Sequence, residues 1–202
     1  VKCWGSNSDG QLGDGTNTYS NTPVDVVALS SGISGISVGG YHTCALTTNE
    51  IGRGWGRKRA EISVVATTSK QNTPVDVVGL GSGVSAIAAG FFHTCALTNS
   101  GGVKCWGRNY YGQLGDGTDT TSFTPVDIVG LSNGISAIEA GYGHTCALTT
   151  GEGVKCWGWN NNGQLGDGTD TDKYTPQNVI GLNSGASPIA AGISHTCALT
   201  TN

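Results

Sequence analysis

The stretch HTCALT occupies residues 42–47 and returns unchanged at 93–98, 144–149 and 195–200. Each copy is displaced by 51 residues from the copy before it. The tryptophans keep the same step, at Trp4, Trp55, Trp106 and Trp157. A fixed period near 50 residues is typical of a repeat architecture. We therefore expect the repeated residues to hold the scaffold, and we look for function in the residues that differ between copies.

Residues 84–131 show the order of parts within one unit. VSAIAAG (84–90), HTCALTN (93–99), VKCWG (103–107) and TPVDIVGL (124–131) each have the length and composition of a short strand, with Gly-rich connections between them. Such a series describes a propeller blade better than a helical repeat. Glycines and β-branched residues fall wherever a helix would have to run, so almost no α-helix is expected.

Composition narrows the functional classes. The chain has 202 residues, 34 of them glycine, and a formal charge of −4, which gives no general attraction to nucleic acid or to an anionic membrane. No apolar run approaches the roughly 18–20 residues of a membrane span. The chain contains no Met, which predicts that it is a piece of a longer product.

The segment GFFHTCALTNSGGVKCWGRNYYGQLGDGT (90–118) resembles the repeat of the regulator of chromosome condensation family. The loop GQLGDGT recurs within 6–16, 108–118 and 159–169, so the resemblance covers essentially the whole chain. It implies an all-β propeller, seven-bladed in the best-known members. Members of this family serve as exchange factors for a small GTPase, as protein-binding platforms and, in bacteria, as secreted inhibitors, so the fold transfers better than the function.

We expect a single β-propeller domain over 1–202, built from repeats at approximately 1–52, 53–102, 103–153 and 154–202. The first residues match the third strand of a unit and the last match the second, so one blade is split between the termini. The chain could close as a four-bladed ring, form an arc of a larger ring, or pair its terminal strands with a neighbouring molecule. The larger arc is favoured, and pairing between molecules comes second.

The repeat is irregular over residues 53–72. Here Arg53 is aligned with Cys105 and Cys156, and residues 61–66 stand where the other units carry GQLGDG. The basic run of Arg53, Arg57, Lys58 and Arg59 falls in the same region. A patch that binds phosphate or nucleic acid would need such a run. The negative net charge of the chain disfavours such a patch, so no nucleic-acid partner is expected.

The seven cysteines can be paired by hairpin symmetry. A turn at Ser100 places Cys95 opposite Cys105, and a turn at Gly151 repeats this for Cys146 and Cys156, which predicts two disulfides. Cys44 is left unpaired because Arg53 is taken to stand opposite it. Cys3 and Cys197 are predicted to pair if the ends of the chain meet. The alternative is that the cysteines are reduced and act as small apolar fillers.

The residues that vary between copies are the candidates for binding. Trp159 has no Trp counterpart, and Tyr41, Phe91, Phe92, Tyr110, Tyr111 and Tyr142 also stand at variable positions that we place on loops. An aromatic, weakly charged face suits contact with protein or glycan, whereas the alternative is scattered surface aromatics. The predicted binding residues are Tyr110, Tyr111, Trp159, Asn160, Asn161 and Asn162.

No catalytic set, metal site or cofactor site is predicted. The four repeated histidines are expected to make structural hydrogen bonds rather than to bind a metal. We therefore expect a non-enzymatic module for protein interaction or assembly, extracellular or on the cell surface because paired cysteines favour an oxidising compartment. The expected partner is a protein or further copies of the chain, without membrane insertion. The alternatives are a self-associating surface or filament subunit, and a guanine-nucleotide exchange factor for a small GTPase.

Overall fold

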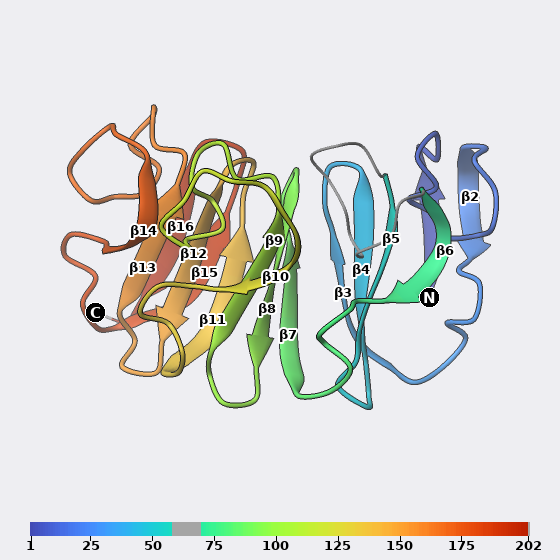
Figure 1. The fold of residues 1–202 in the computed structure, drawn as a ribbon, viewed down its shortest axis with the longest axis horizontal. Coiled ribbons are helices and arrows are strands. Elements are labelled where there is room, and N and C mark those ends of the chain that lie inside the picture. The colour runs from blue at the N-terminus through green and yellow to red at the C-terminus, as the bar shows by residue number, and fades with distance from the viewer. Residues whose placement is uncertain (58–69, 202) are drawn as a thin grey trace.

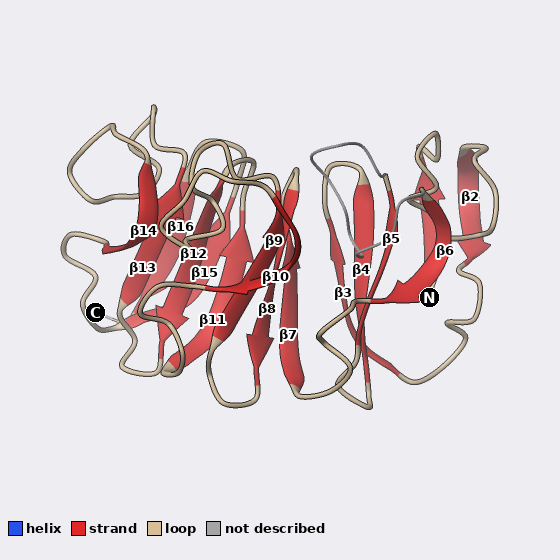
Figure 2. Cartoon of the chain, in the orientation of Figure 1, coloured by secondary structure: helices blue, strands red, loops and turns tan. Residues whose placement is uncertain are grey.

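The computed structural model describes residues 1–57 and 70–201 of the chain. Within these residues every regular element is a β-strand (Figure 2), and the strands form an arc of radially arranged sheets (Figure 1). The all-β propeller architecture and the four-stranded blades are therefore confirmed. The predicted alignment of residues 61–66 and the basic residues Lys58 and Arg59 lie outside the described part of the chain.

Three complete blades are antiparallel sheets in which neighbours in sequence are neighbours in space. The first blade contains β3 (Ile33–Val38), β4 (His42–Thr47), β5 (Gly52–Gly56) and β6 (Gln71–Asp76). The second contains β7 (Val84–Ala89), β8 (His93–Thr98), β9 (Val103–Gly107) and β10 (Ser122–Asp127). The third contains β11 (Ile135–Ala140), β12 (His144–Thr149), β13 (Val154–Gly158) and β14 (Lys173–Asn178).

Two half-blades flank the complete blades. The outer strands β1 (Lys2–Gly5) and β2 (Ser20–Asp25) pair with each other at one end, and the inner strands β15 (Ala186–Ala191) and β16 (Thr196–Thr200) pair at the other. The N- and C-termini consequently lie at opposite ends of the arc (Figure 1). The two halves of the split blade do not meet within one chain, and Cys3 and Cys197 are free thiols. The condition for their predicted bond, that the ends of the chain meet, is not fulfilled in this structure, and the bond is not formed.

The core lies between adjacent blades and is built from the repeated residues. Trp55, Trp106 and Trp157 are fully buried, and Leu46 and Leu97 of the HTCALT strands pack in the same clusters as Trp106 and Trp157 respectively. The glycine that follows each of these tryptophans is required by the backbone: Gly107 has φ +109°, and a Cβ there would lie 2.6 Å from the carbonyl oxygen of Phe92. The repeated Trp-Gly pair is thus explained by close packing of the third strand on the loop that joins the first two strands of the same blade.

The structure contains the disulfides Cys95–Cys105 and Cys146–Cys156, each between directly opposed strand residues with Cα atoms 4.1 Å apart. In the first blade the residue opposite Cys44 is Gly54 and not Arg53, so that prediction was wrong by one position. Arg53 lies instead opposite Ala45, and its Nε is 2.7 Å from Oδ1 of Asp76.

Cys44 is fully buried and free, as predicted, but the cause is a missing side chain rather than an arginine. Burial raises the pKa of its thiol to about 12, so the thiolate that reacts with oxidants is scarce. We conclude that this cysteine serves as core filling.

Candidate functional site: an aromatic rim with two arginines

One edge of the arc carries two sets of loops side by side. The short loops joining the first and second strands of the complete blades, and the long loops after β9 and β13, both lie at the upper edge in Figure 1. A backbone hydrogen bond joins the sets in every complete blade: the amide nitrogens of Arg57, Arg108 and Trp159 donate to the carbonyl oxygens of Tyr41, Phe92 and Gly143 respectively. The residues that vary most between repeats are therefore held together.

In the first two blades this pairing stacks an arginine on an aromatic ring. The guanidinium of Arg57 lies 4.5 Å from the ring centroid of Tyr41, and that of Arg108 lies 5.0 Å from Phe92. Arg108 also covers Tyr110, at 4.5 Å. Each such contact contributes about 0.5–1 kcal/mol at an exposed site. The arginines thereby place positive charge beside the rings, and Nε of Arg57 also lies 3.9 Å from Oδ1 of Asp9.

The third blade has different residues at the same two positions of the repeat. Gly143 has no side chain to stack upon, and Trp159 replaces the arginine. The indole instead contacts Tyr111 and Tyr142, with ring centroids 5.9 and 5.8 Å away. Tyr142 continues to Phe91 at 4.7 Å, and Phe91 reaches Tyr41 of the first blade at 5.3 Å. The rings form one connected ridge across three blades.

We call this surface the aromatic rim. It comprises Tyr41, Phe91, Phe92, Tyr110, Tyr111, Tyr142 and Trp159 together with Arg57 and Arg108. Tyr110 is 47% exposed and the other aromatic members are partly exposed. Beside the rim lies a cavity of about 300 Å³, lined by the glycines of the short loops and by Phe91 and Tyr142. The rings are thus available to a ligand that approaches this edge.

The structure separates the predicted binding residues. Tyr110, Tyr111 and Trp159 lie together in the rim, and Asn161 and Asn162 are exposed at its margin. Asn160 is fully buried: its Nδ2 donates to Asp167 and to the backbone carbonyl of Thr171, and its Oδ1 accepts from the amide of Leu165. Asn160 therefore stabilises its own loop and does not form part of the contact surface.

Sequence reasoning noted every aromatic member of the rim as variable, but it chose a contact set from only two loops. The signal that could have found the rest was the repeat itself. Tyr41, Phe92 and Gly143 occupy one position of the unit, and Arg57, Arg108 and Trp159 occupy another. Radial packing of equal blades brings equivalent positions to one edge.

The repeated histidines belong to the framework. Nε2 of His93 is 2.8 Å from Oγ1 of Thr145 in the next blade, and Thr145 donates its hydroxyl hydrogen to the carbonyl of Gln113. Since that hydrogen is already used, Thr145 must accept from His93, whose Nε2 carries the proton. Burial lowers the pKa of His42 and His144 to about 4, and that of His93 to about 3 with the added effect of the two neighbouring histidines. These rings are neutral at physiological pH.

We next asked whether side chains that could bind a metal ion lie close together in the described residues 1–57 and 70–201. No group of three or more His, Cys, Asp or Glu side chains there is arranged to hold a metal ion. Nor does any helix in this part of the chain have the length and apolar character needed to cross a membrane. The aromatic rim is therefore the best-formed candidate site among the described residues.

Comparison with known proteins agrees with this architecture. The regulator of chromosome condensation (RCC1) repeat matches residues 3–46, 100–148 and 154–199, and a second description of the same repeat matches 84–113 and 135–164. The ultraviolet-B receptor UVR8 of Arabidopsis thaliana is 33% identical over 99% of this chain and 46% of its own length. The probable E3 ubiquitin-protein ligase HERC4 of Homo sapiens is 35% identical over 90% of this chain and 18% of its own length.

Two solved structures have a similar fold. Human WBSCR16 superposes with a TM-score of 0.88 at 28% identity, over 100% of this chain and 53% of that one. Yeast RCC1 (Prp20), in a structure with Kap60, gives 0.81 at 26% identity, over 98% of this chain and 49% of that one. The chain thus spans about half the length of these relatives or less. The repeats, the blades and these likenesses together show that the chain belongs to the regulator of chromosome condensation (RCC1) repeat family.

Proposed function

We propose that this chain is a module for protein interaction and that the aromatic rim is its contact surface. The observation that carries the proposal is the continuity of the rim, because six aromatic side chains from three blades adjoin one another beside two stacked arginines, and Tyr110 joins them through Arg108. Aromatic residues and arginine are the types that contribute most to protein interfaces. The chain contributes binding in this proposal and performs no catalysis of its own.

The relatives support a binding role without identifying the partner. One is named a receptor, one was crystallised with Kap60, and one is named a probable ubiquitin ligase of which this chain matches only 18%. What they share with this chain is the repeat domain. A partner of this chain would therefore be chosen by the residues that vary between repeats, which the rim collects.

An extracellular or cell-surface setting is part of the proposal. It is supported by the two hairpin disulfides, because disulfides form and persist mainly in oxidising compartments. The alternative, an exchange factor for a small GTPase, would operate where thiols stay reduced. Titration of free thiols in protein isolated without reductant distinguishes the two. Three free thiols are expected, from Cys3, Cys44 and Cys197, whereas seven would favour the exchange factor.

The rim itself is tested by selecting a displayed peptide library on the unmodified chain. Peptides so obtained should lose at least tenfold in affinity on Arg108→Ala and on Tyr110→Ala. Tyr19→Ala is the matched control, because Tyr19 is 74% exposed and stands outside the rim. If the selected peptides bind all three variants as they bind the original chain, the rim is not the contact surface.

A further inference from the structure

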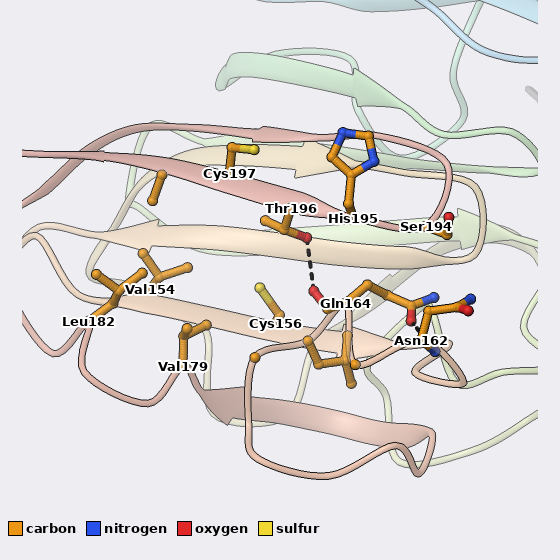
Figure 3. Close-up of a pocket in the computed structure, with 14 residues that line it drawn as sticks. Val154, Cys156, Asn162, Gln164, Val179, Leu182, Ser194, His195, Thr196 and Cys197 are labelled. Atoms are coloured by element: carbon orange, nitrogen blue, oxygen red, sulfur yellow. Dashed lines mark hydrogen bonds between the residues drawn. The ribbon is translucent and has the colours of Figure 1, made fainter.

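One position of the long loops is held by the same bond in three repeats, although its side chain differs. It stands two residues before the glutamine of GQLGDGT and is occupied by Asp9, Tyr111 and Asn162. The three backbone amides donate to Oε1 of that glutamine, at 2.9, 3.0 and 2.9 Å respectively, and Figure 3 shows Asn162 beside its glutamine. The backbone is therefore fixed alike while the side chain changes from a carboxylate to a phenol and a carboxamide. Such a position can set binding specificity without altering the scaffold.

This position meets the residue that follows the third strand of the next blade, and the chemistry of the contact changes along the rim. At the first complete blade the contact is ionic, because Oδ1 of Asp9 lies 3.9 Å from Nε of Arg57. Two repeats later the same two positions hold Tyr111 and Trp159, whose ring centroids are 5.9 Å apart. The intervening contact includes residue 60, which lies outside the described part of the chain. One site of the repeat is thus ionic at the first blade and aromatic at the third.

The part of the rim over the first and second blades is basic. Arg57 and Arg108 are stacked on rings here, and Nζ of Lys70 donates to the carbonyl oxygen of Ser8 at 2.6 Å, next to Asp9. The carboxylate of Asp9 offsets one of these three positive charges. Stacking uses the face of a guanidinium, and its five N–H donors point outward from its edge. A stacked arginine can therefore bind a further carboxylate while it keeps its existing contacts.

The part of the rim over the third blade is uncharged at the equivalent positions. Trp159 stands in place of an arginine and contacts Tyr111 and Tyr142. A Cβ built on Gly143 would lie 3.1 Å from Cδ2 of Tyr111 and 3.3 Å from Cβ of Trp159, so these side chains lie over the glycine. The result is a continuous apolar surface of rings. Surfaces of this kind bind aliphatic and aromatic side chains at protein interfaces.

We propose that the rim binds a segment of a protein partner in one direction, with acidic side chains on Arg57 and Arg108 and an apolar side chain on Trp159 and Tyr142. This inference rests on the proposed function and specifies the chemistry and orientation of the partner. A protein carboxylate is favoured over the phosphates of a nucleic acid because the chain as a whole carries a formal charge of −4. Asp9 already presents a carboxylate to Arg57, so it competes with the partner at this end of the rim.

The first test uses peptides selected from a display library on the unmodified chain. We expect enrichment of Asp and Glu, with an aliphatic or aromatic residue always on the same side of the acidic one. Arg57→Gln and Arg108→Gln should each weaken the selected peptides about tenfold, and Arg108→Lys, which keeps the charge, should weaken them less. Arg53→Gln is the matched control, because Arg53 pairs with Asp76 outside the rim and its loss should leave affinity unchanged.

The outcomes separate this inference from the proposed function. Peptides that require Tyr110 but show no acidic enrichment, and that tolerate both arginine changes, would overturn the inference and leave the rim as the contact surface. Peptides that bind every rim variant as they bind the unmodified chain would overturn both.

The second test predicts a gain of affinity. Asp9→Asn removes the chain's own carboxylate from Arg57 and should strengthen acidic peptides about threefold. A residue that only stabilised its loop would give no such gain. Asp25→Asn is the matched control, because Asp25 pairs with Lys2 outside the rim. Unchanged or weaker binding by Asp9→Asn would overturn the assignment of Arg57 to the partner's carboxylate.

Double-mutant cycles test the direction of the bound segment. The acidic residue of a selected peptide is changed to its amide and combined with Arg108→Gln, and the apolar residue is changed to Ala and combined with Trp159→Ala. Each matched pair should be coupled, so that the double change weakens binding no more than the larger single change, whereas the crossed pairs should act independently. Coupling confined to the crossed pairs would show that the segment lies in the opposite direction, which overturns the proposed orientation.

Discussion

The first and second complete blades share a fold but differ in what ties their middle strands together. In the second blade β8 and β9 are joined by Cys95–Cys105, whereas in the first Cys44 faces Gly54 across the same register. The valine that begins β9, Val103, is buried, and Gly52 stands in its place in β5. Two side chains are thus missing from the first blade, yet its strand pairing is unchanged.

This difference shows which residues determine the geometry and which only stabilise it. Both blades keep the buried histidine, the HTCALT strand and the buried tryptophan. The disulfide is an addition to a hairpin that forms without it, because its main effect is to restrict the unfolded chain. We therefore expect changes in the shared residues to affect both blades equally, and changes at positions 52 and 54 to make the blades more alike.

The largest expected effect is acid destabilisation through the shared histidines. Their pKa values are lowered by burial to about 4, 3 and 4 for His42, His93 and His144, from 6.5 in the unfolded chain. Below pH 6.5 the unfolded state binds protons that the folded state does not. Stability is therefore complete above that value and declines as the pH falls toward about 4, by roughly 3 kcal/mol per histidine.

Denaturant unfolding followed between pH 7.5 and 5 measures this slope before most carboxylates titrate. His42→Gln in the first blade and His93→Gln in the second should each flatten the slope. A slope that is the same in both variants and in the unmodified chain would contradict the assignment of acid sensitivity to these rings.

Removing a buried tryptophan should have the next largest effect, and it should be equal in the two kinds of blade. Trp55→Ala and Trp157→Ala each empty a fully buried site and remove a hydrogen bond to a glutamine carbonyl. We expect each to lower the free energy of unfolding by about 3–5 kcal/mol. Trp4→Ala, at an exposed position, should cost less than about 1 kcal/mol in the monomer, as measured by urea unfolding.

Restoring the missing cysteine should stabilise the first blade. Gly54→Cys places a thiol opposite Cys44 in the register that carries a disulfide in the second and third blades. Closing this short loop should add about 2–3 kcal/mol under oxidising conditions. The gain should vanish with reductant, and Cys44→Ser in the same variant should abolish it. Peptide mapping that finds position 54 as a free thiol would contradict the register.

The smallest effect is expected at Gly52. A Cβ built there would meet Ile87 at 3.8 Å and Leu80 at 3.9 Å, which is ordinary van der Waals contact. Gly52→Ala should therefore raise stability by about 0.5–1 kcal/mol, since a glycine within a strand loses more freedom on folding. The matched change in the second blade, Val103→Ala, should lower stability. A loss with Gly52→Ala would show that the first blade has repacked around the missing side chain.

The fold could be predicted almost entirely from the sequence, because the 51-residue period and the strand-and-turn order repeat without ambiguity. The hairpin pairs Cys95–Cys105 and Cys146–Cys156 followed from symmetry about a turn. The partner of Cys44 was misplaced by one residue because β5 lacks both the valine and the cysteine that anchor the alignment of the other copies. Counting from the shared tryptophan would have identified Gly54.

The candidate site could be predicted only in part. Variable aromatics such as Tyr110 and Trp159 stood out, but the sequence does not say which positions from different repeats share an edge. Asn160 was misplaced for the opposite reason: Asn7 and Asn109 hold the same position, so it belonged to the framework. Its burial follows from hydrogen bonds within its own loop, as for Asn7 with Asp14 and Asn109 with Asp116.

The histidine of one blade donates to a threonine of the next blade, and this threonine donates back to a glutamine carbonyl of the first, as from His93 to Thr145 and from Thr145 to Gln113. A unit of this kind therefore offers a histidine donor and a carbonyl acceptor to the unit after it, and a threonine hydroxyl that meets both to the unit before it. A gene that gains or loses one whole unit still encodes compatible neighbours on both sides of the change. Such a lineage can change the number of blades in its propeller by duplication, without first evolving a new contact between blades.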